Sequence, residues 1–162
     1  MAGGDDRARL LERAELIERA RLLGVPLSDS AAGSLARLLD ELAQWNRAYN
    51  LSAIRRREEM LTRHVLDSLS VHGDLAGSTI ADVGTGAGFP GLPLAVANPQ
   101  RRFTLIDSNG KKVRFVRHAV HTLALGNVAV MQARAEDLHP EAPFDTVVAR
   151  AFAPLPELLE QV

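Results

Sequence analysis

The fold of this chain is decided by the stretch Thr79-Ile80-Ala81-Asp82-Val83-Gly84-Thr85-Gly86-Ala87-Gly88. An apolar run, Thr79–Val83, leads into three glycines spaced two residues apart, and Gly91 follows. A short apolar run that ends in glycines is typical of a buried strand followed by a tight turn. Glycine lets the backbone turn sharply and approach a ligand closely, because it carries no Cβ. Four glycines in eight residues cost more chain entropy than a plain turn requires, so the pattern predicts a ligand-binding loop.

The spacing of these glycines distinguishes two kinds of cofactor loop. A dinucleotide-binding loop, G-x-G-x-x-G, needs a glycine where this chain has Phe89. The sequence instead reads D-x-G-x-G-x-G, which resembles the S-adenosylmethionine loop of class I methyltransferases. The resemblance implies S-adenosylmethionine as cofactor, bound by Asp82, Gly84, Gly86 and Gly88. A nicotinamide-dependent oxidoreductase stays open as an alternative, because it shares the arrangement of strand, loop and acid.

After this loop, short apolar runs alternate with helical patterns. Further buried strands are expected over residues 102–106, 128–132 and 146–149, and helices over 91–97, 111–125 and 154–162. Alternating strands and helices predict crossover connections and a parallel sheet that is covered on both faces. The predicted fold class is therefore α/β, a Rossmann-like class I methyltransferase core over residues 77–162.

Residues 1–76 have a helical pattern and are expected to form an N-terminal segment that packs on the core. The first helix should end near Gly24, with an apolar stripe of Leu10, Leu11, Ala14, Ile17 and Leu22. The second, capped by Ser28 or Asp29, has the stripe Leu35, Leu38, Leu39, Leu42 and Trp45. A third helical stretch is expected roughly over residues 58–75.

The composition excludes several classes of function. The 162 residues include no cysteine, which rules out disulfides, thiolate metal sites and a cysteine nucleophile, and fits a reducing cytoplasm. No apolar run approaches the ~20 residues that span a bilayer, so no membrane anchor is predicted. The histidines at 72, 118, 121 and 139 are dispersed without ligand spacing, so no metal site is predicted. The net charge of −1 means that any contact with nucleic acid must come from local basic patches.

Two further positions complete a predicted nucleoside pocket. Asp107 ends the second strand, where an acid can accept hydrogen bonds from both ribose hydroxyls. Asp107, Ser108 or Asn109 could also cap the following helix. Glu136 follows the third strand, where a methyltransferase places groups against the adenine, although a solvated loop acid fits the spacing nearly as well.

The segment after the fourth strand disfavours one methylation chemistry. Methyltransferases that act on exocyclic amines generally have an Asn/Asp-Pro-Pro-aromatic motif there, whereas this chain has Ala149-Arg150-Ala151-Phe152. Methylation of pyrimidine carbon 5 by the usual covalent route needs a cysteine and is excluded. Nucleophiles with a free lone pair, such as guanine N7, remain, and positioning and desolvation can then provide most of the catalysis.

Several motifs from about residue 35 onward together resemble one family. They are Trp45–Ile54, Glu58–Leu61, Arg63–Leu69, Asp82–Pro93, Asp107–Lys112 and Arg150–Ala153. On these motifs the chain is similar to the small-subunit ribosomal RNA methyltransferase G family, also called glucose-inhibited division protein B. The resemblance implies transfer of a methyl group from S-adenosylmethionine to N7 of guanine 527 of 16S rRNA, near the decoding site, with S-adenosylhomocysteine as product.

The resemblance also implies site residues and partners. By position, the cofactor contacts of the family carry over to Gly84, Phe89, Ala135, Glu136 and Arg150. The expected substrate is 16S rRNA within the small ribosomal subunit, bound by a cytoplasmic monomer. Family members continue for several dozen residues after the Arg-Ala-Phe segment, so a C-terminal truncation is expected. A non-catalytic fragment that binds the cofactor or RNA is the alternative interpretation.

No catalytic residue follows from the pattern alone, and the candidates are Arg150, His64 and Asp67. His64 and Asp67 lie three positions apart on one helical face and could orient the guanine; a hydrogen-bonded bridge between helix and sheet is the favoured alternative. The candidates for binding RNA phosphates are Arg55, Arg56, Arg57, Arg63, Lys111 and Lys112.

The residues that follow the second apolar stripe have two possible roles. Asn46, Tyr49 and Asn50 could contact a splayed base. They could equally close the helix that ends near Trp45, and the spacing does not decide between these roles.

Overall fold

A computed structural model of the chain describes residues 2–150. Its centre is a four-stranded parallel sheet of β1 (Thr79–Val83), β2 (Arg102–Asp107), β3 (Val128–Gln132) and β4 (Thr146–Val148). The strand order is β3-β2-β1-β4, so the chain moves outward from β1 on one side and then returns to its other side. The sheet therefore has its switch point at β1 and β4, and ligands of such sheets bind at the carboxyl ends of the strands beside this point.

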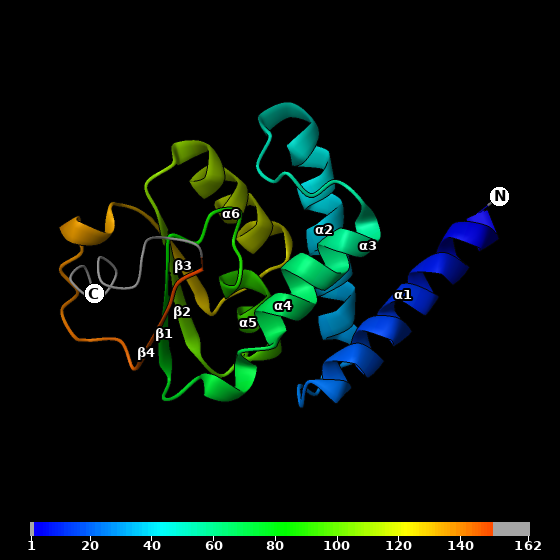
Figure 1. Ribbon diagram of the computed structural model, residues 1–162, viewed down its shortest axis with the longest axis horizontal. Helices are drawn as coiled ribbons and strands as arrows, with labels where there is room; N and C mark the ends of the chain where they lie inside the picture. The colour runs from blue at the N-terminus through cyan, green and yellow to red at the C-terminus, as the bar shows by residue number, and fades with distance from the viewer. Residues whose placement is uncertain (1, 151–162) are drawn as a thin grey trace.

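Helices are stacked in layers on one face of the sheet (Figure 1). The layer next to the sheet contains α5 (Gly91–Ala97) and α6 (Gly110–Thr122). Outside it lie α2 (Asp29–Tyr49) and a continuous helical stretch formed by α3 (Arg57–Met60), the π-helical turn η1 (Leu61–Leu66) and α4 (Asp67–Leu69). The outermost helix is α1 (Ala2–Leu22), and two 3₁₀ turns, η2 (His72–Asp74) and η3 (Ala135–Asp137), complete the elements.

One hydrophobic core joins the N-terminal helices to the sheet. Leu38 and Leu42 of α2, Leu92 of α5, Phe103 of β2 and Phe115 of α6 are all fully buried in the same cluster. Burial at about 25 cal/mol per Å² of apolar surface makes this shared core the main stabilising contribution. The N-terminal segment packs on the core as expected, while the division at residues 76 and 77 stays a prediction.

Within residues 2–150, the two faces of the sheet are covered unequally. On the second face, a small cluster of Ala81, Val83, Ile106 and Ala135 is covered by Ala133, Leu138 and Phe144 of the segment after β3. Met131 of β3 and Val147 of β4 are exposed. These two strands lie at the edges of the described sheet, so they are less buried than β1 and β2.

Of the apolar stripe predicted for the first helix, Ile17 packs against the core, but the leucines do not. Leu10, Leu11 and Leu22 are 63%, 63% and 71% exposed, whereas Leu16 and Ala20 are buried. The N-terminal half of α1 projects away from the rest of the molecule (Figure 1), so Leu10 and Leu11 have no apolar surface to pack on. The stripe predicted for α2 is confirmed: its four leucines are buried, and Trp45 packs against the core.

The remaining helix predictions have mixed outcomes. Ser28 caps α2 by accepting a hydrogen bond from Ala31 N at 3.0 Å. The helix expected at 111–125 ends at Thr122, and the helix expected at 154–162 lies outside the described residues. None of the helices within residues 2–150 has the length and apolar character needed to cross a bilayer.

Candidate functional site

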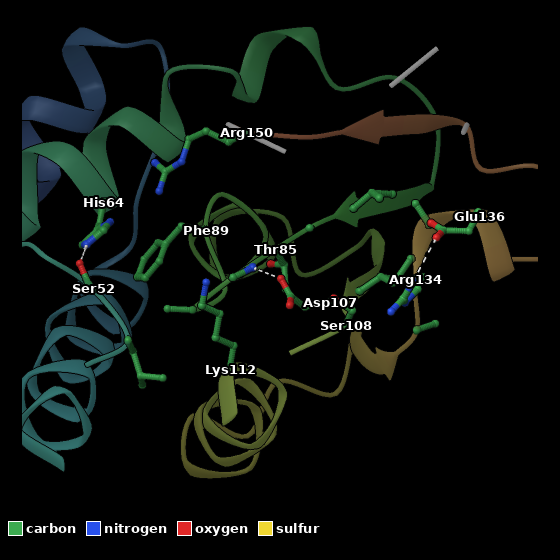
Figure 2. A pocket seen from close by; sticks show the side chains of 18 residues that line it. Ser52, His64, Thr85, Phe89, Asp107, Ser108, Lys112, Arg134, Glu136 and Arg150 are labelled. Atoms are coloured by element: carbon green, nitrogen blue, oxygen red, sulfur yellow. Dashed lines mark hydrogen bonds and ion pairs between the residues drawn. The ribbon is translucent and has the colours of Figure 1, made fainter. Parts of the chain in front are cut away.

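A cavity of about 720 Å³ opens at the carboxyl ends of β1 and β2 and beside the loop that follows β3 (Figure 2). Its walls come from the N-terminal helical segment, the glycine loop, β2 and the segment after β3. The lining residues include Ser52, His64, Gly84, Thr85, Gly86, Phe89, Asp107, Lys112, Ala135, Glu136 and Arg150. The structure thus brings together most of the predicted cofactor residues, which lie up to 66 positions apart, from Gly84 to Arg150.

The glycine loop connects β1 to α5 and forms the floor of this cavity. Gly86 has φ +61°, and a Cβ added there would meet no atom within 4 Å. Gly88 has φ +99°, and an added Cβ would collide with the Leu92 side chain. Only glycine adopts both conformations without strain. The open space at Gly86 lets a ligand approach the backbone, whereas Gly88 is required by packing and does not line the cavity.

Asp82 holds this loop in place from the buried side, away from the cavity. It is fully buried, and its Oδ2 accepts hydrogen bonds from Thr85 Oγ1 at 2.6 Å and from Gly91 N at 2.8 Å. Its other oxygen, Oδ1, has no partner among the described residues. Burial raises the pKa of Asp82 to about 6, and these hydrogen bonds only partly offset that effect. Asp82 does not line the cavity, so direct contact with a cofactor stays a prediction.

Asp107 fixes the middle of the cavity at the end of β2. Its Oδ2 accepts from Gly86 N at 2.8 Å and its Oδ1 accepts from Asn109 N at 2.8 Å. The helix cap is Asn109, which accepts from the backbone N–H groups of Lys111 and Lys112. Asp107 is therefore not the cap of α6. Its carboxylate lies at the cavity wall, where the residue is half-buried.

Ala135 and Glu136 line the cavity beyond Asp107, at the start of η3. Ala135 is buried, whereas Glu136 is exposed and lies 3.9 Å from Arg134. An apolar wall next to an exposed carboxylate suits a flat heterocycle with an amino group at its edge.

His64 lies at the opposite end of the cavity from Glu136 (Figure 2). Its ring stacks on Phe89 with a centroid distance of 4.6 Å and an interplanar angle of 19°. Its Nε2 lies 2.8 Å from Ser52 Oγ, and its Nδ1 has no partner among the described residues. Burial, followed by the charge of Arg150, lowers the pKa of His64 to about 4, so the ring is neutral at pH 7.

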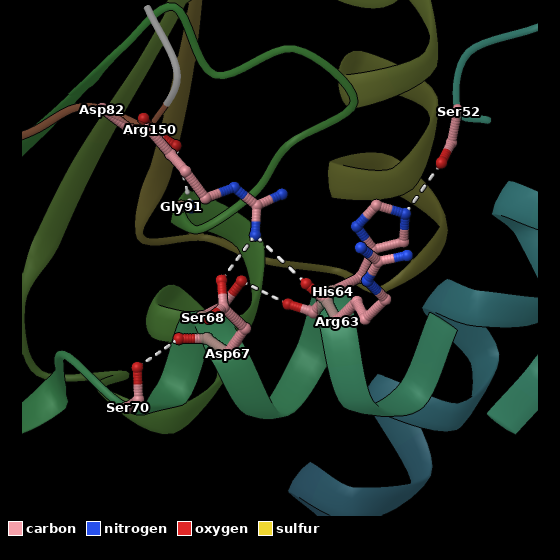
Figure 3. A network of polar contacts seen from close by, with 9 residues as sticks. All are labelled: Ser52, Arg63, His64, Asp67, Ser68, Ser70, Asp82, Gly91 and Arg150. Carbon is pink, nitrogen blue, oxygen red and sulfur yellow. Dashed lines mark hydrogen bonds and ion pairs between the residues drawn. The ribbon is translucent and has the colours of Figure 1, made fainter. Parts of the chain in front are cut away.

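Arg150 follows β4 and connects the sheet to the N-terminal helical segment (Figure 3). Its Nη1 donates to Asp67 Oδ2 at 3.0 Å and to the backbone oxygen of Arg63 at 3.2 Å. Asp67 itself does not line the main cavity. The bridge expected between helix and sheet is therefore formed by Asp67 and Arg150, while His64 bonds to Ser52.

The predicted RNA-binding residues differ in how strongly other side chains engage them. Arg57 donates to both carboxylate oxygens of Glu12, at 2.7 and 2.9 Å, and lies 3.0 Å from Asp40. The structure therefore does not favour an RNA-binding role for Arg57, because its guanidinium joins α1, α2 and α3. Arg55 donates to Asn46 O and Asn50 Oδ1, although it is exposed.

The other four basic candidates differ in how close they are to the cavity. Arg56, Arg63 and Lys111 are exposed, and Lys112 is half-buried. Among these, Lys112 alone lines the cavity. Arg63 does not line the cavity, and its backbone oxygen accepts from Arg150.

The residues that follow Trp45 close the helix. Asn46 is buried; its amide donates to Ser52 O at 2.9 Å and its Oδ1 accepts from Ser52 N at 2.9 Å. Asn50 ends α2 in the left-handed conformation. Of the three residues, Tyr49 is exposed and forms no such closure.

Ser52 and Thr85 are among the cavity residues that were not predicted from the sequence. Ser52 was part of a family motif and Thr85 lies between two loop glycines, but neither had a pattern that pointed to a contact. Thr85 sits where it does because its hydroxyl is held by Asp82, and Ser52 because Asn46 fixes its backbone. Both positions depend on contacts in the folded chain, which the sequence pattern does not show.

The family of the chain is shown by its similarity to known proteins. Residues 32–162 match the model of the family described as rRNA small subunit methyltransferase G. The chain belongs to this family. Its α/β sheet with N-terminal helices accordingly represents the methyltransferase fold of the rRNA small subunit methyltransferase G family.

Curated relatives of this family agree with the match. A ribosomal RNA small subunit methyltransferase G of Pectobacterium atrosepticum is 46% identical over 136 residues, covering 84% of this chain and 66% of the relative. Proteins of the same description from Yersinia pseudotuberculosis and Idiomarina loihiensis are 47% and 48% identical, with 66% of each relative covered. The chain therefore spans slightly less than two thirds of the length of these relatives.

Proposed function

We propose that this chain transfers a methyl group from S-adenosylmethionine to N7 of guanine 527 of 16S rRNA. The observation that carries the proposal is the cavity built from the glycine loop, the Asp107 carboxylate and the Ala135–Glu136 wall. The names of its relatives support the class of substrate. The proposed setting is the small ribosomal subunit in the bacterial cytoplasm, with the chain acting as a monomer.

The cavity residues fit S-adenosylmethionine in a specific order. The backbone at Gly86 is open to a ligand, which suits the methionyl part of the cofactor. The Asp107 carboxylate would accept from the ribose hydroxyls, and Glu136 would accept from the adenine amino group beside Ala135. The bound cofactor supplies a methyl group activated by a sulfonium centre.

The end of the cavity at His64, opposite Glu136, is suited to a nucleophile that needs no general base to remove a proton. Guanine N7 has a free lone pair, so transfer requires alignment and exclusion of water more than proton transfer. His64, with a pKa of about 4, holds no proton to donate as an imidazolium at pH 7. The stacked His64–Phe89 pair and Arg150 would then position the base.

RNA phosphates would be held by the basic residues whose side chains donate no hydrogen bond within residues 2–150; Arg56 has an exposed ion pair with Glu59 at 3.7 Å. Arg56, Arg63, Lys111 and Lys112 form this proposed set, and exposed Arg55 remains a secondary candidate. Phosphate contacts of this kind weaken with rising salt, because binding releases counterions. Binding to the small subunit should therefore fall by orders of magnitude between low and moderate salt.

Calorimetry and methyl incorporation together test the proposal. S-adenosylhomocysteine should bind the chain and NADH should not; the reverse result would favour a nicotinamide-dependent oxidoreductase. The chain should then transfer labelled methyl groups from S-adenosylmethionine to small subunits that lack the modification. Binding of S-adenosylhomocysteine without any transfer would contradict the proposal and support a non-catalytic cofactor-binding role.

A further inference from the structure

The buried imidazole of His64 has one nitrogen that the protein leaves unused. His64 is 8% exposed and lines the cavity, yet its Nδ1 has no hydrogen-bond partner within residues 2–150. A buried polar atom without a partner costs roughly 1–3 kcal/mol. Such an atom at the wall of a ligand cavity indicates that a ligand supplies the partner.

The hydrogen bond to Ser52 determines which ring nitrogen carries the proton. Ser52 Oγ already accepts from Ile54 N at 3.1 Å. In the described part of the chain, the acceptor within reach of its hydroxyl hydrogen is His64 Nε2, at 2.8 Å. With Ser52 as the donor to Nε2, the neutral ring carries its hydrogen on Nδ1. His64 thus has a free N–H donor.

This donor is directed toward a second one. Figure 3 shows Nδ1 on the side of the ring that faces the Arg150 guanidinium. Arg150 uses Nη1 for Asp67 and Arg63, and the contacts of the described residues leave Nη2 free. Two donors that face each other cannot bond to one another, but a single oxygen between them can accept from both.

The position of this pair in the sheet indicates where that oxygen comes from. The proposed cofactor extends from the loop after β1 past Asp107 of β2 to Glu136 after β3. Arg150 follows β4, on the other side of β1, and His64 lies at the same end of the cavity. This end is left for the base that receives the methyl group.

Resting on the proposed function, we propose that His64 Nδ1 and Arg150 together bind O6 of the target guanine and make the site specific for a 6-oxopurine. Guanine presents N7 and O6 as neighbouring acceptors on one edge, whereas adenine has an amino donor in place of O6. An adenine would place its N6 amino group, a donor, against His64 Nδ1–H and the Arg150 guanidinium, which are also donors. None of the three would then have an acceptor. O6 held in this way leaves the N7 lone pair free for the methyl group.

Replacement of His64 tests the proposal on the enzyme. His64→Phe keeps a flat ring against Phe89 and removes the donor, whereas His64→Asn keeps a donor. We expect kcat/KM on small subunits to fall about 10- to 100-fold in His64→Phe and to recover in part in His64→Asn. The Kd for S-adenosylhomocysteine should stay within about twofold, because the affected interaction is made only with the base.

The matched control is His118→Phe. His118 also packs against an aromatic ring, Trp45, with a centroid distance of 5.0 Å, and its Nε2 is within hydrogen-bond distance of Glu41 and Thr122, but it lies outside the cavity. This variant should transfer methyl groups at the wild-type rate. Unchanged kcat/KM in His64→Phe would overturn the proposal. A parallel tenfold loss of S-adenosylhomocysteine affinity would also overturn it, since the oxygen would then belong to the cofactor carboxylate.

A binding measurement keeps this proposal separate from the proposed function. In the chain saturated with S-adenosylhomocysteine, the ¹⁵N resonances of His64 should show a hydrogen on Nδ1. Millimolar guanosine monophosphate should shift the Nδ1 resonance, and adenosine monophosphate should not. This result is independent of turnover, so it holds even if no methyl transfer is detected. Equal shifts with both nucleotides, or a hydrogen on Nε2, would contradict the proposal.

Discussion

The buried carboxyl group of Asp82 connects the cofactor loop to pH. Its pKa of about 6 in the folded chain lies above its ordinary value of 3.8 because of burial, although the bonds from Thr85 and Gly91 and the charge of Arg150 act the other way. The folded state therefore holds this proton more tightly than the unfolded state. The resulting stabilisation is complete below about pH 3.8 and is lost as the pH rises through about 6.

Replacement of Asp82 by Asn should remove this pH dependence. The amide oxygen can still accept from Thr85 and Gly91, but the side chain no longer ionises. Between pH 4.5 and 7.5 the free energy of unfolding of Asp82→Asn should gain about 2 kcal/mol relative to wild type. Urea unfolding of both proteins at the two pH values measures this change. A difference that is independent of pH would show that Asp82 keeps its ordinary pKa.

The two central glycines of the loop should respond differently to alanine. Gly88→Ala forces a Cβ into Leu92 at φ +99°, which should lower the free energy of unfolding by about 2–3 kcal/mol. Gly86→Ala meets no protein atom, so the loss should be only about 1 kcal/mol. Its methyl group would instead occupy space for the ligand and weaken S-adenosylhomocysteine binding by at least about tenfold.

Chemical denaturation and calorimetry on the same two variants check this contrast. If Gly86→Ala bound S-adenosylhomocysteine as tightly as wild type, the cofactor would not approach the loop backbone there.

The sequence predicted the cavity residues better than their supporting contacts. Gly84, Gly86, Asp107 and Glu136 were identified because each lies at or shortly after the end of a strand, and the ends of parallel strands meet at one edge. The clamp formed by Asp82 and the free nitrogen of His64 were not predictable. Both depend on which neighbours surround a buried side chain, and spacing along the chain does not encode those neighbours.

Among the helices, the clearest error of prediction was in α1. Apolar residues spaced three or four apart in α1 fit more than one helical face. The face that is buried contains Leu16 and Ala20, whereas Leu10 and Leu11 are exposed. The choice depends on how far α2 extends alongside α1. The α2 stripe was predictable, because its leucines fall on a single face and the opposite face is polar.

Arg57 should stabilise the packing of these helices. It forms ion pairs with Glu12 of α1 and Asp40 of α2 and also donates to Ala36 O. Arg57→Ala should lower the free energy of unfolding by about 2 kcal/mol, because charged partners lose their hydrogen bonds. The matched variant Arg56→Ala should change it by less than about 0.5 kcal/mol, since the Arg56 side chain is 75% exposed.

Binding to the small subunit should show the opposite order for these two variants. Arg56→Ala should weaken binding and reduce its salt dependence, and Arg57→Ala should leave both unchanged at a temperature where it is folded. Thermal unfolding and binding titrations at several salt concentrations provide the two measurements. A weaker and less salt-dependent complex for Arg57→Ala alone would return Arg57 to the RNA-binding set.

At the level of the whole molecule, the order of elements along the chain was predictable and the order of the strands in the sheet was not. The alternation of strands and helices predicted a parallel sheet, and β1 and β3 have the predicted bounds. The edge positions of β3 and β4 follow from the strand order β3-β2-β1-β4, which a sequence pattern does not give. The shared core explains why the N-terminal segment contributes His64 and Ser52 to a cavity formed by the sheet.

The most direct test is to locate the methyl group on the RNA. Small subunits that lack the modification would be incubated with the chain and S-adenosylmethionine, and the 16S rRNA would be digested and analysed by mass spectrometry. The proposal predicts 7-methylguanosine at one guanine, position 527, and none without the chain. A methyl group on a different atom or base, or its absence when S-adenosylhomocysteine binding is verified, would contradict it.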